Sequence, residues 1–336
     1  YIDSQARFTC VSSHGERHPL TEIFEVRGVG MYKKNVAFDM LESLSDIQMR
    51  GYVEQLIKLD INIEDIIKWF FETYLLQEFD IKDYTCNMPN PADSILSKCK
   101  TLASAIDGVL SKYKMLCDDG EIDLELFKYI TDSPRIKDIP SRIKNKYCYV
   151  INSELIKEMN MLFSSQSMLG YTEKTKYDSL IKLISNEDIK LSECEPYNIA
   201  SLNWLIEKGS IYIEDDVINY NKERVFILHE FYEKEVISLQ HIKSPLLKRL
   251  IKNGDIYVDN KLLSKPEYKY FDYILNNSEF SDGKAIRNRY IHDSIVPDNN
   301  TMIADYYTLL KIMILLIIKI NDDCCIYDEI DLKSTR

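Results

Sequence analysis

The sequence is poor in glycine and proline, with 10 and 9 residues among 336. This scarcity excludes collagen-like repeats and disfavours linker-rich arrays and sandwiches built on many tight turns. Hydrophobic residues make up 45% and charged residues 29%, which suits a packed core and argues against long disorder. A chain of this length predicts two or three domains of ordinary size.

Motifs that hold metals, cofactors or phosphates are missing. The eight cysteines stand singly apart from Cys324-Cys325, and no C-x-x-C pair occurs. The sequence also lacks the phosphate-binding G-x-x-x-x-G-K-[ST], the dinucleotide-binding G-x-G-x-x-G, G-x-S-x-G and H-E-x-x-H. His14 and His18 have the spacing of helical metal ligands, but Gly15 and Pro19 place them in a loop. We therefore expect no metal and no cofactor.

Features of secreted or membrane proteins are scarce. The first ten residues are mostly polar, so no secretory leader is predicted. The run 309–320 is shorter than the roughly 20 apolar residues of a membrane span, and Lys311 and Lys319 interrupt it. We interpret this run as a buried helix of a soluble protein. Unpaired cysteines in a chain of this size favour a reduced, cytoplasmic protein.

The net charge of −12 argues against a protein coated in basic charge, but it leaves room for local basic sites. Two basic stretches stand out, and either can contact phosphates or form a solvated helix face. They comprise Arg135, Lys137, Arg142, Lys144 and Lys146, and then Lys243, Lys248, Arg249 and Lys252.

Helical periodicity dominates from Met40 onward. Asn62 is expected to cap one helix, and Asn90, with Pro91 at the first position, to cap the next. An apolar stripe then runs from residue 95 to residue 116, and Gly120 ends that helix.

The middle of the chain contains an internal repeat with an offset of about 45 residues. L-I-E-K-G-S-I-Y-I at 205–213 matches L-I-K-N-G-D-I-Y-V at 250–258. Each copy is typical of a helix that ends at glycine, followed by a short strand and a turn. A helix followed by a small hairpin is the pattern of a winged-helix unit, so two copies predict a tandem.

The segment K-A-I-R-N-R-Y-I-H at 284–292 concentrates polar chemistry. On a helix, Lys284, Arg287, Asn288 and His292 would fall along one stripe. Such a stripe offers a permanent cation, an amide and a titratable imidazole. A loop at 297–300 and a long apolar helix from about 301 to 320 are expected to follow.

This segment resembles the R-N-x-x-x-H form of the R-x(4–6)-H motif in the HEPN superfamily, with Arg287, Asn288 and His292 matching. The resemblance covers roughly the last 70 residues. Two features depart from it, because Asp293 stands where many members carry glycine and Ser294 where some carry tyrosine. The family implies metal-independent cleavage of RNA, usually by a symmetric dimer with one shared cleft.

The chemistry of such cleavage suits these residue types. Histidine ordinarily titrates at about pH 6.5, so His292 can accept or donate a proton, which is typically worth ~10²–10⁴-fold in rate. Arg287 stays protonated and offers a planar donor fork to phosphate oxygens. Asn288 would orient the site. RNA contacts are expected from Lys284 and Arg289, and from Lys248, Arg249 and Lys252.

The bare motif is not specific, because Arg224 and His229 show the same spacing. The apolar residues 225–228 between them mark a buried segment, which favours a structural role for this second copy. A structural role, bracing a helical bundle, also remains open for Arg287 and His292.

We therefore predict a mainly α protein with a small α+β part. It has a helical region at 1–118, a tandem winged-helix-like middle at 119–265 and a HEPN-type bundle at 266–336. The predicted function is an endoribonuclease, with a bacterial toxin or anti-phage role implied by the family. We also expect a homodimer through the C-terminal helices, because residues 309–318 are apolar on every side of a helix. A regulatory protein partner is a further expectation. The rival prediction is a scaffold that binds nucleic acid or protein and whose HEPN-like module only dimerises.

Overall fold

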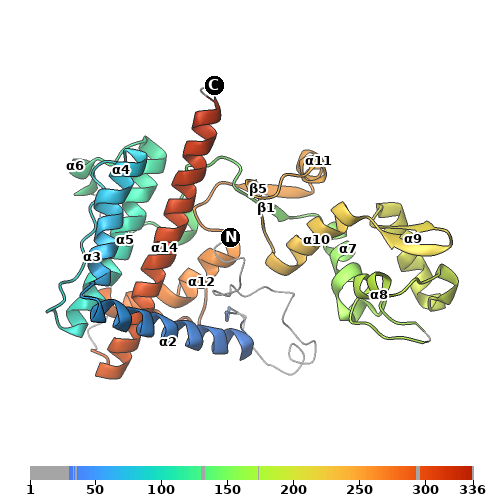
Figure 1. Cartoon of the computed structure of the whole chain (residues 1–336), viewed down its shortest axis with the longest axis horizontal. Helices are drawn as coiled ribbons and strands as arrows, with labels where there is room; N and C mark the ends of the chain where they lie inside the picture. Colours follow the sequence, from blue (N-terminus) through green and yellow to red (C-terminus); the bar gives the residue numbers. More distant parts are fainter. Residues whose placement is uncertain are drawn as a thin grey trace. The chain divides into compact units, whose positions relative to one another are not determined.

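The computed structural model describes residues 30–32, 34, 36–129, 133–172, 174–292 and 296–334. The described chain is mainly helical with two small antiparallel sheets, which confirms the predicted fold class at that level (Figure 1). It divides into two compact units. Unit 1 comprises the described residues within Arg27–Lys146 and Asn260–Arg336, and unit 2 comprises Tyr147–Asp259.

This division differs from the three predicted regions. The N-terminal and C-terminal helices build one unit, because the buried apolar side chains of both belong to a single core. The predicted middle also began too early and ended too late, since residues 119–146 and 260–265 belong to unit 1. Unit 2 has a core of its own, and no residue is shared between the two cores among the described side chains.

Unit 1 is a helical bundle. Its elements are α2 (Val36–Lys58), α3 (Ile63–Trp69), the π-helix η1 (Phe70–Tyr74), α4 (Leu75–Phe79), α5 (Ile95–Asp119), α6 (Leu124–Phe127), the 3₁₀-helix η2 (Ile136–Asp138), α12 (Lys265–Leu275), α13 (Ile286–Ile291) and α14 (Asn299–Ser334). α14 packs against α5, α2 and α3 (Figure 1). The apolar stripe predicted for α5 is buried in this core.

The start of α5 differs from the prediction. Ser94 is its N-cap and accepts a hydrogen bond from the Ser97 backbone N–H at 3.2 Å. Asn90 instead opens a turn, in which its backbone N–H donates to Asp93. The end of α5 is as expected, because Gly120 closes the helix with a φ of 84°, in the left-handed region that glycine adopts without strain.

α14 is longer than the predicted helix and is largely enclosed by unit 1. Leu309, Leu310, Ile312, Met313 and Leu316 are buried in this unit's core. Within 309–318, the large apolar side chain that is clearly exposed is Ile318, at 45%. The apolar perimeter is therefore largely covered by the helix's own unit, and the side chains of this run that stay partly or clearly exposed are Ile314, Ile317 and Ile318.

By length and composition, α14 is long and apolar enough to cross a membrane. The apolar run 309–320 alone predicts a segment too short for a membrane span, whereas the observed helix extends over Asn299–Ser334. Of its most apolar window, 61% is buried within the protein. Its two lysines also lie inside the unit, where Lys311 binds Glu42 at 2.9 Å and Lys319 binds Glu267 at 3.1 Å. These contacts fit the interpretation of a core helix.

Unit 2 alternates short strands with helices. Its elements are β1 (Tyr147–Val150), α7 (Ser153–Phe163), η3 (Ser165–Ser167), α8 (Leu180–Asn186), η4 (Leu191–Glu193), η5 (Pro196–Asn198), α9 (Ile199–Lys208), β2 (Ile211–Glu214), β3 (Val217–Tyr220), α10 (Lys222–Lys234), β4 (Ile237–Ser238), α11 (Pro245–Asn253) and β5 (Ile256–Asp259). One sheet has the order β4-β1-β5, and the other pairs β2 with β3.

The internal repeat appears as α9–β2 and α11–β5, each helix closed by a glycine. Gly209 and Gly254 have φ of 76° and 78°. The hairpin is confirmed for the first copy, where β2 pairs with β3 through Asp215 and Asp216. It is wrong for the second copy, since β5 pairs with β1. β1, with which the chain enters unit 2, thus takes the place of the second hairpin strand, and the chain leaves unit 2 after β5.

Candidate functional site

The R-N-x-x-x-H segment forms a short helix, α13, which begins later than predicted. Ala285 precedes it with a φ of 50°, in the left-handed region. Gly283 packs against backbone, because a Cβ there would lie 2.6 Å from the Asn276 carbonyl oxygen. Lys284 therefore stands outside the helix, 3.4 Å from Glu42, and the predicted stripe through all four polar residues was wrong for Lys284.

Arg287 is held by a carboxylate from α5. Its Nε donates to Asp107 Oδ1 and Oδ2 at 3.0 and 2.9 Å, and its Nη2 donates to Oδ2 at 2.7 Å. Nη2 also reaches the Ser133 hydroxyl at 3.1 Å. This bidentate geometry is the strong form of an arginine–carboxylate pair. It fixes the position of the guanidinium and neutralises much of its charge.

Asn288 and His292 lie next to this pair on the same helix. Asn288 accepts from Arg287 Nη1 at 3.2 Å and donates to Asn277 at 3.0 Å. His292 ends α13, and its side chain is exposed. Asp293 and Ser294, where the chain departs from the family pattern, lie outside the described residues.

Arg287 and Asn288 line a pocket of about 390 Å³ within unit 1. Its other walls come from Asp107 of α5, residues 133–137, α12 and the segment after α12. The pocket mixes charges, since Lys137 pairs with Glu279 at 2.7 Å and Arg135 pairs with Asp138 at 2.7 Å. His292 is not among the lining residues. The structure thus brings Arg287 and Asn288 to one cavity and leaves His292 outside it.

Arg289, predicted to contact RNA, points into unit 1 instead. It forms an ion pair with Asp305, which also accepts from the Tyr290 hydroxyl at 2.8 Å. Its Nη2 donates to the Lys284 carbonyl oxygen at 3.3 Å. Phosphate binding by Arg289 would compete with these contacts.

The second copy of the motif has the same kind of arginine contact. Arg224 Nε and Nη2 donate to the two carboxylate oxygens of Glu158, both at 2.7 Å, and Nε reaches Ser210 at 3.1 Å. Arg224 thus has the same two kinds of partner as Arg287, one carboxylate and one serine hydroxyl. Because Glu158 is buried, a structural role for Arg224 is supported. The segment 225–228 is buried as predicted except at Phe226, which is exposed, and His229 beyond it is exposed as well.

The two basic stretches differ in their surroundings. In the first, Lys146 forms a buried pair with Asp323, and Arg142 lies over the Tyr327 ring at 3.9 Å. These residues precede β1 and do not form a solvated helix face. In the second, the structure gives no ion pair to any of the four basic residues within its described part. All four are exposed: Lys243, Lys248, Arg249 and Lys252.

No protein-family model, curated protein or solved structure matches this chain. The functional argument therefore rests on the residues themselves. His14 and His18 lie outside the described residues, and in the described ranges no three His, Cys, Asp or Glu side chains gather as a metal would need. Sequence reasoning missed Asp107 and Ser133. A lone acid between Ile106 and Val109 on an apolar helix was the available signal for Asp107.

Proposed function

We propose that this protein cleaves RNA without a metal ion, at the pocket of unit 1 beside α13. The observation that carries the proposal is the position of Arg287 and Asn288 on one pocket wall, with His292 at the end of the same short helix. In this reaction a ribose 2′-hydroxyl attacks the adjacent phosphate. His292 moves the proton, and Arg287 stabilises the charge that develops on phosphorus-bound oxygens.

The contacts of Arg287 leave it partly available. A guanidinium has five N–H donors, and Asp107, Ser133 and Asn288 engage Nε, Nη2 and one N–H of Nη1. The remaining N–H of Nη1 has no acceptor among the described residues. A donor held in place by Asp107 loses little conformational freedom when it binds phosphate, which is how preorganised charge stabilisation operates.

A homodimer belongs to this proposal. Cleavage needs one group that accepts a proton and another that donates one, and a two-fold axis would bring two copies of His292 to one phosphate. The contact would involve the C-terminal helices. We further propose that unit 1 is of HEPN type and that the protein is cytoplasmic. Its proposed role is that of a toxin or anti-phage effector with a regulatory protein partner.

The winged-helix-like description of unit 2 is part of the proposal as well. Its support is the order of elements in the first copy. α8 is followed by a segment in which the Ile189 carbonyl accepts from the Ile218 N–H of β3, and then by α9 and the hairpin β2–β3. In the second copy, α10, β4, α11 and β5 follow in the same order, with β1 as the third strand.

The decisive experiment incubates the full chain with total RNA. His292→Ala should abolish cleavage and leave the fold and the oligomeric state unchanged, because its side chain is exposed. His229→Ala is the matched control, since it removes an exposed histidine from the other copy of the motif and should cleave like wild type. Arg287→Ala should also lose cleavage. Wild-type activity in His292→Ala would remove the proposal.

The products provide an independent check of the same reaction. Attack by the 2′-hydroxyl leaves a 2′,3′-cyclic phosphate or 3′-phosphate and a 5′-hydroxyl, which end-group labelling distinguishes. A substrate with 2′-deoxy at the scissile position should remain intact, and EDTA should have no effect. Loss of cleavage on chelation would instead indicate a metal-dependent nuclease.

A scaffold is the second candidate, and the Arg287–Asp107 pair is the observation that favours it. Arg224 has the same arrangement and supports a structural role, so Arg287 can equally brace α13 against α5. On this alternative the wild-type protein binds nucleic acid or protein, dimerises and cleaves nothing. Intact RNA after incubation with pure wild-type protein, together with measurable binding, would decide for the scaffold.

A further inference from the structure

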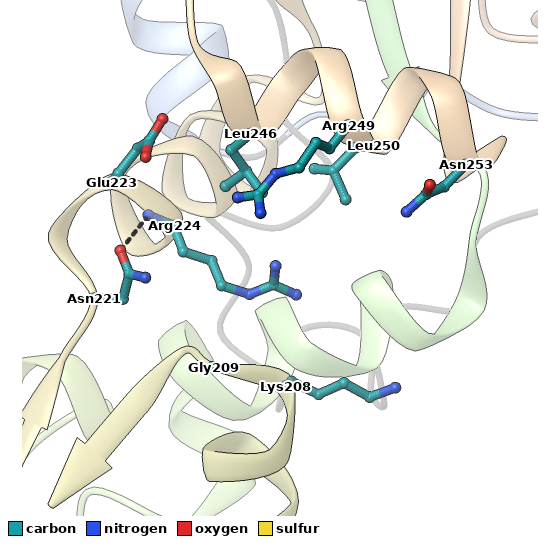
Figure 2. A pocket seen from close by; sticks show the side chains of 9 residues that line it. All are labelled: Lys208, Gly209, Asn221, Glu223, Arg224, Leu246, Arg249, Leu250 and Asn253. Atoms are coloured by element: carbon teal, nitrogen blue, oxygen red, sulfur yellow. Dashed lines mark hydrogen bonds between the residues drawn. The ribbon is translucent and has the colours of Figure 1, made fainter.

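Unit 2 contains a cavity of about 330 Å³ that the proposed cleavage does not use (Figure 2). It lies where the end of α9, the start of α10 and one face of α11 meet. Three cationic side chains and two amides line it, together with two leucines, a glycine and one acid. These residues are Lys208, Gly209, Asn221, Glu223, Arg224, Leu246, Arg249, Leu250 and Asn253.

Arg224 presents a fixed guanidinium to this cavity. Its Nε and Nη2 are bound to the buried Glu158, and Nε also donates to Ser210. No described residue accepts a hydrogen bond from Nη1. Figure 2 shows the guanidinium extending into the space between the helices. Two carboxylate contacts hold one edge of the group, so its other edge can donate without reordering the side chain.

Arg249 faces the same space from α11 and has no ion pair among the described residues (Figure 2). Asn253 lies one turn further along α11 and adds an amide. Glu223 is turned away from the two guanidinium groups and accepts from the Ser244 hydroxyl at 2.6 Å. Lys208 is held by Glu154. The free positive charge of the cavity therefore comes from Arg249, beside the fixed donors of Arg224.

We propose that this cavity binds a phosphodiester group of a nucleic acid, held between Arg224 and Arg249. Two planar donor forks suit the oxygens of a phosphate better than the single point charge of an ammonium does. The occupant is a polynucleotide because Lys248 and Lys252 are also exposed on α11, where neighbouring phosphates would meet them. The inference rests on unit 2 alone and holds whether or not unit 1 cleaves RNA.

The test measures binding of the full chain to a short fluorescent 2′-O-methyl RNA, which lacks the 2′-hydroxyl needed for the proposed cleavage. Fluorescence anisotropy gives the Kd over a range of salt concentrations. Arg249→Ala should weaken binding about tenfold and lower the slope of log K against log salt by about 1, because one phosphate contact is lost. Its side chain is exposed, so folding should be unaffected.

Asn253→Asp gives a second variant of nearly unchanged shape. It adds a carboxylate to the cavity and should weaken binding at least as much as Arg249→Ala. Asn203→Asp is the matched control, because Asn203 is exposed on α9 and does not line the cavity. It makes the same charge change in the same unit and should bind nearly like wild type.

Three outcomes of the direct binding measurements would overturn the inference. They are no binding of the RNA by wild-type protein, unchanged affinity in Arg249→Ala, and equal effects of Asn253→Asp and Asn203→Asp. Competition with uridine monophosphate distinguishes the source of the phosphate. Weak competition by uridine monophosphate supports a polynucleotide as the occupant. If uridine monophosphate displaces the RNA at a concentration equal to that of the RNA, the cavity binds a free nucleotide and the proposal of a polynucleotide is overturned.

Discussion

Two arginines in this chain share a sequence motif and a type of contact, yet differ in the carboxylate that holds them. Glu158, the partner of Arg224, has a side chain that is 1% exposed, and Asp107, the partner of Arg287, is 19% exposed. A buried carboxylate without its partner keeps an uncompensated charge, whereas a partly exposed one can be hydrated. Motif spacing alone cannot show this difference.

We therefore expect Arg224→Ala to lower the free energy of unfolding by about 3–5 kcal/mol, which is the cost of breaking a buried pair from one side. Arg287→Ala should cost clearly less, since water reaches Asp107. Urea denaturation followed by circular dichroism measures both variants. Equal losses would show that burial of the carboxylate does not determine the role of the arginine.

The helices of unit 1 are joined by buried charges as well as by apolar contacts. Glu267 at the start of α12 accepts from the Ser264 backbone N–H at 2.7 Å and pairs with Lys319 of α14. Burial by itself raises the pKa of Glu267, but nearby positive charge, above all that of Lys319, together with the Ser264 N–H outweighs it and lowers the pKa to about 2. Burial likewise raises the pKa of Asp323, but Lys146, with hydrogen bonds from Ser141 and Tyr113, outweighs it, so the pKa of Asp323 is lowered.

These lowered carboxyl pKa values predict that unit 1 loses stability in acid. A carboxylate whose pKa is lower in the folded state stabilises the fold above its unfolded pKa, which is about 4.3 for Glu. That contribution disappears as the pH falls towards about 2, where Glu267 takes up its proton. Urea unfolding measured between these pH values should show a steady decline.

Glu267→Gln should be less stable at neutral pH, but its stability should fall less steeply in acid, because the variant has one fewer group to protonate. A slope equal to that of wild type would mean that Glu267 does not carry the pH dependence.

At the scale of the whole molecule, unit 2 is an insertion into unit 1. The chain enters it through β1 and leaves it through β5, and the end residues Tyr147 and Asp259 are partners in the same ladder. Unit 1 resumes at once, since the Ser141 N–H donates to the Asn260 carbonyl at 2.8 Å. Unit 2 also encloses a hydrophobic core of its own.

We expect a fragment of residues 147–259 to fold alone, because the buried core cluster and the three-stranded sheet that the described residues form both lie within this range. Circular dichroism should show one cooperative thermal transition, and limited proteolysis should leave the fragment intact. A fragment that starts after β1 is the matched control and should unfold more easily, since β4 and β5 would lose the strand between them. An unfolded 147–259 fragment would contradict the independence of unit 2.

The sequence by itself determined most local structure. The periodic stripe of α5, its end at Gly120 and the two helix–glycine–strand copies depend on neighbours within a few residues, so pattern and turn chemistry predict them. A helix at Arg287 and Asn288 was likewise predicted, although it begins later than expected.

Tertiary structure decided the rest, because it depends on residues far apart in the chain. Strand pairing is one example, since β5 pairs with β1 more than a hundred residues earlier and not in a second hairpin. The electrostatic state of Arg287 is another, as it is set by Asp107 on a helix that sequence spacing does not connect to α13. The coverage of α14 is the third: an all-apolar helix indicates burial, but only the packing of α2, α3 and α5 shows that the burial occurs within its own unit.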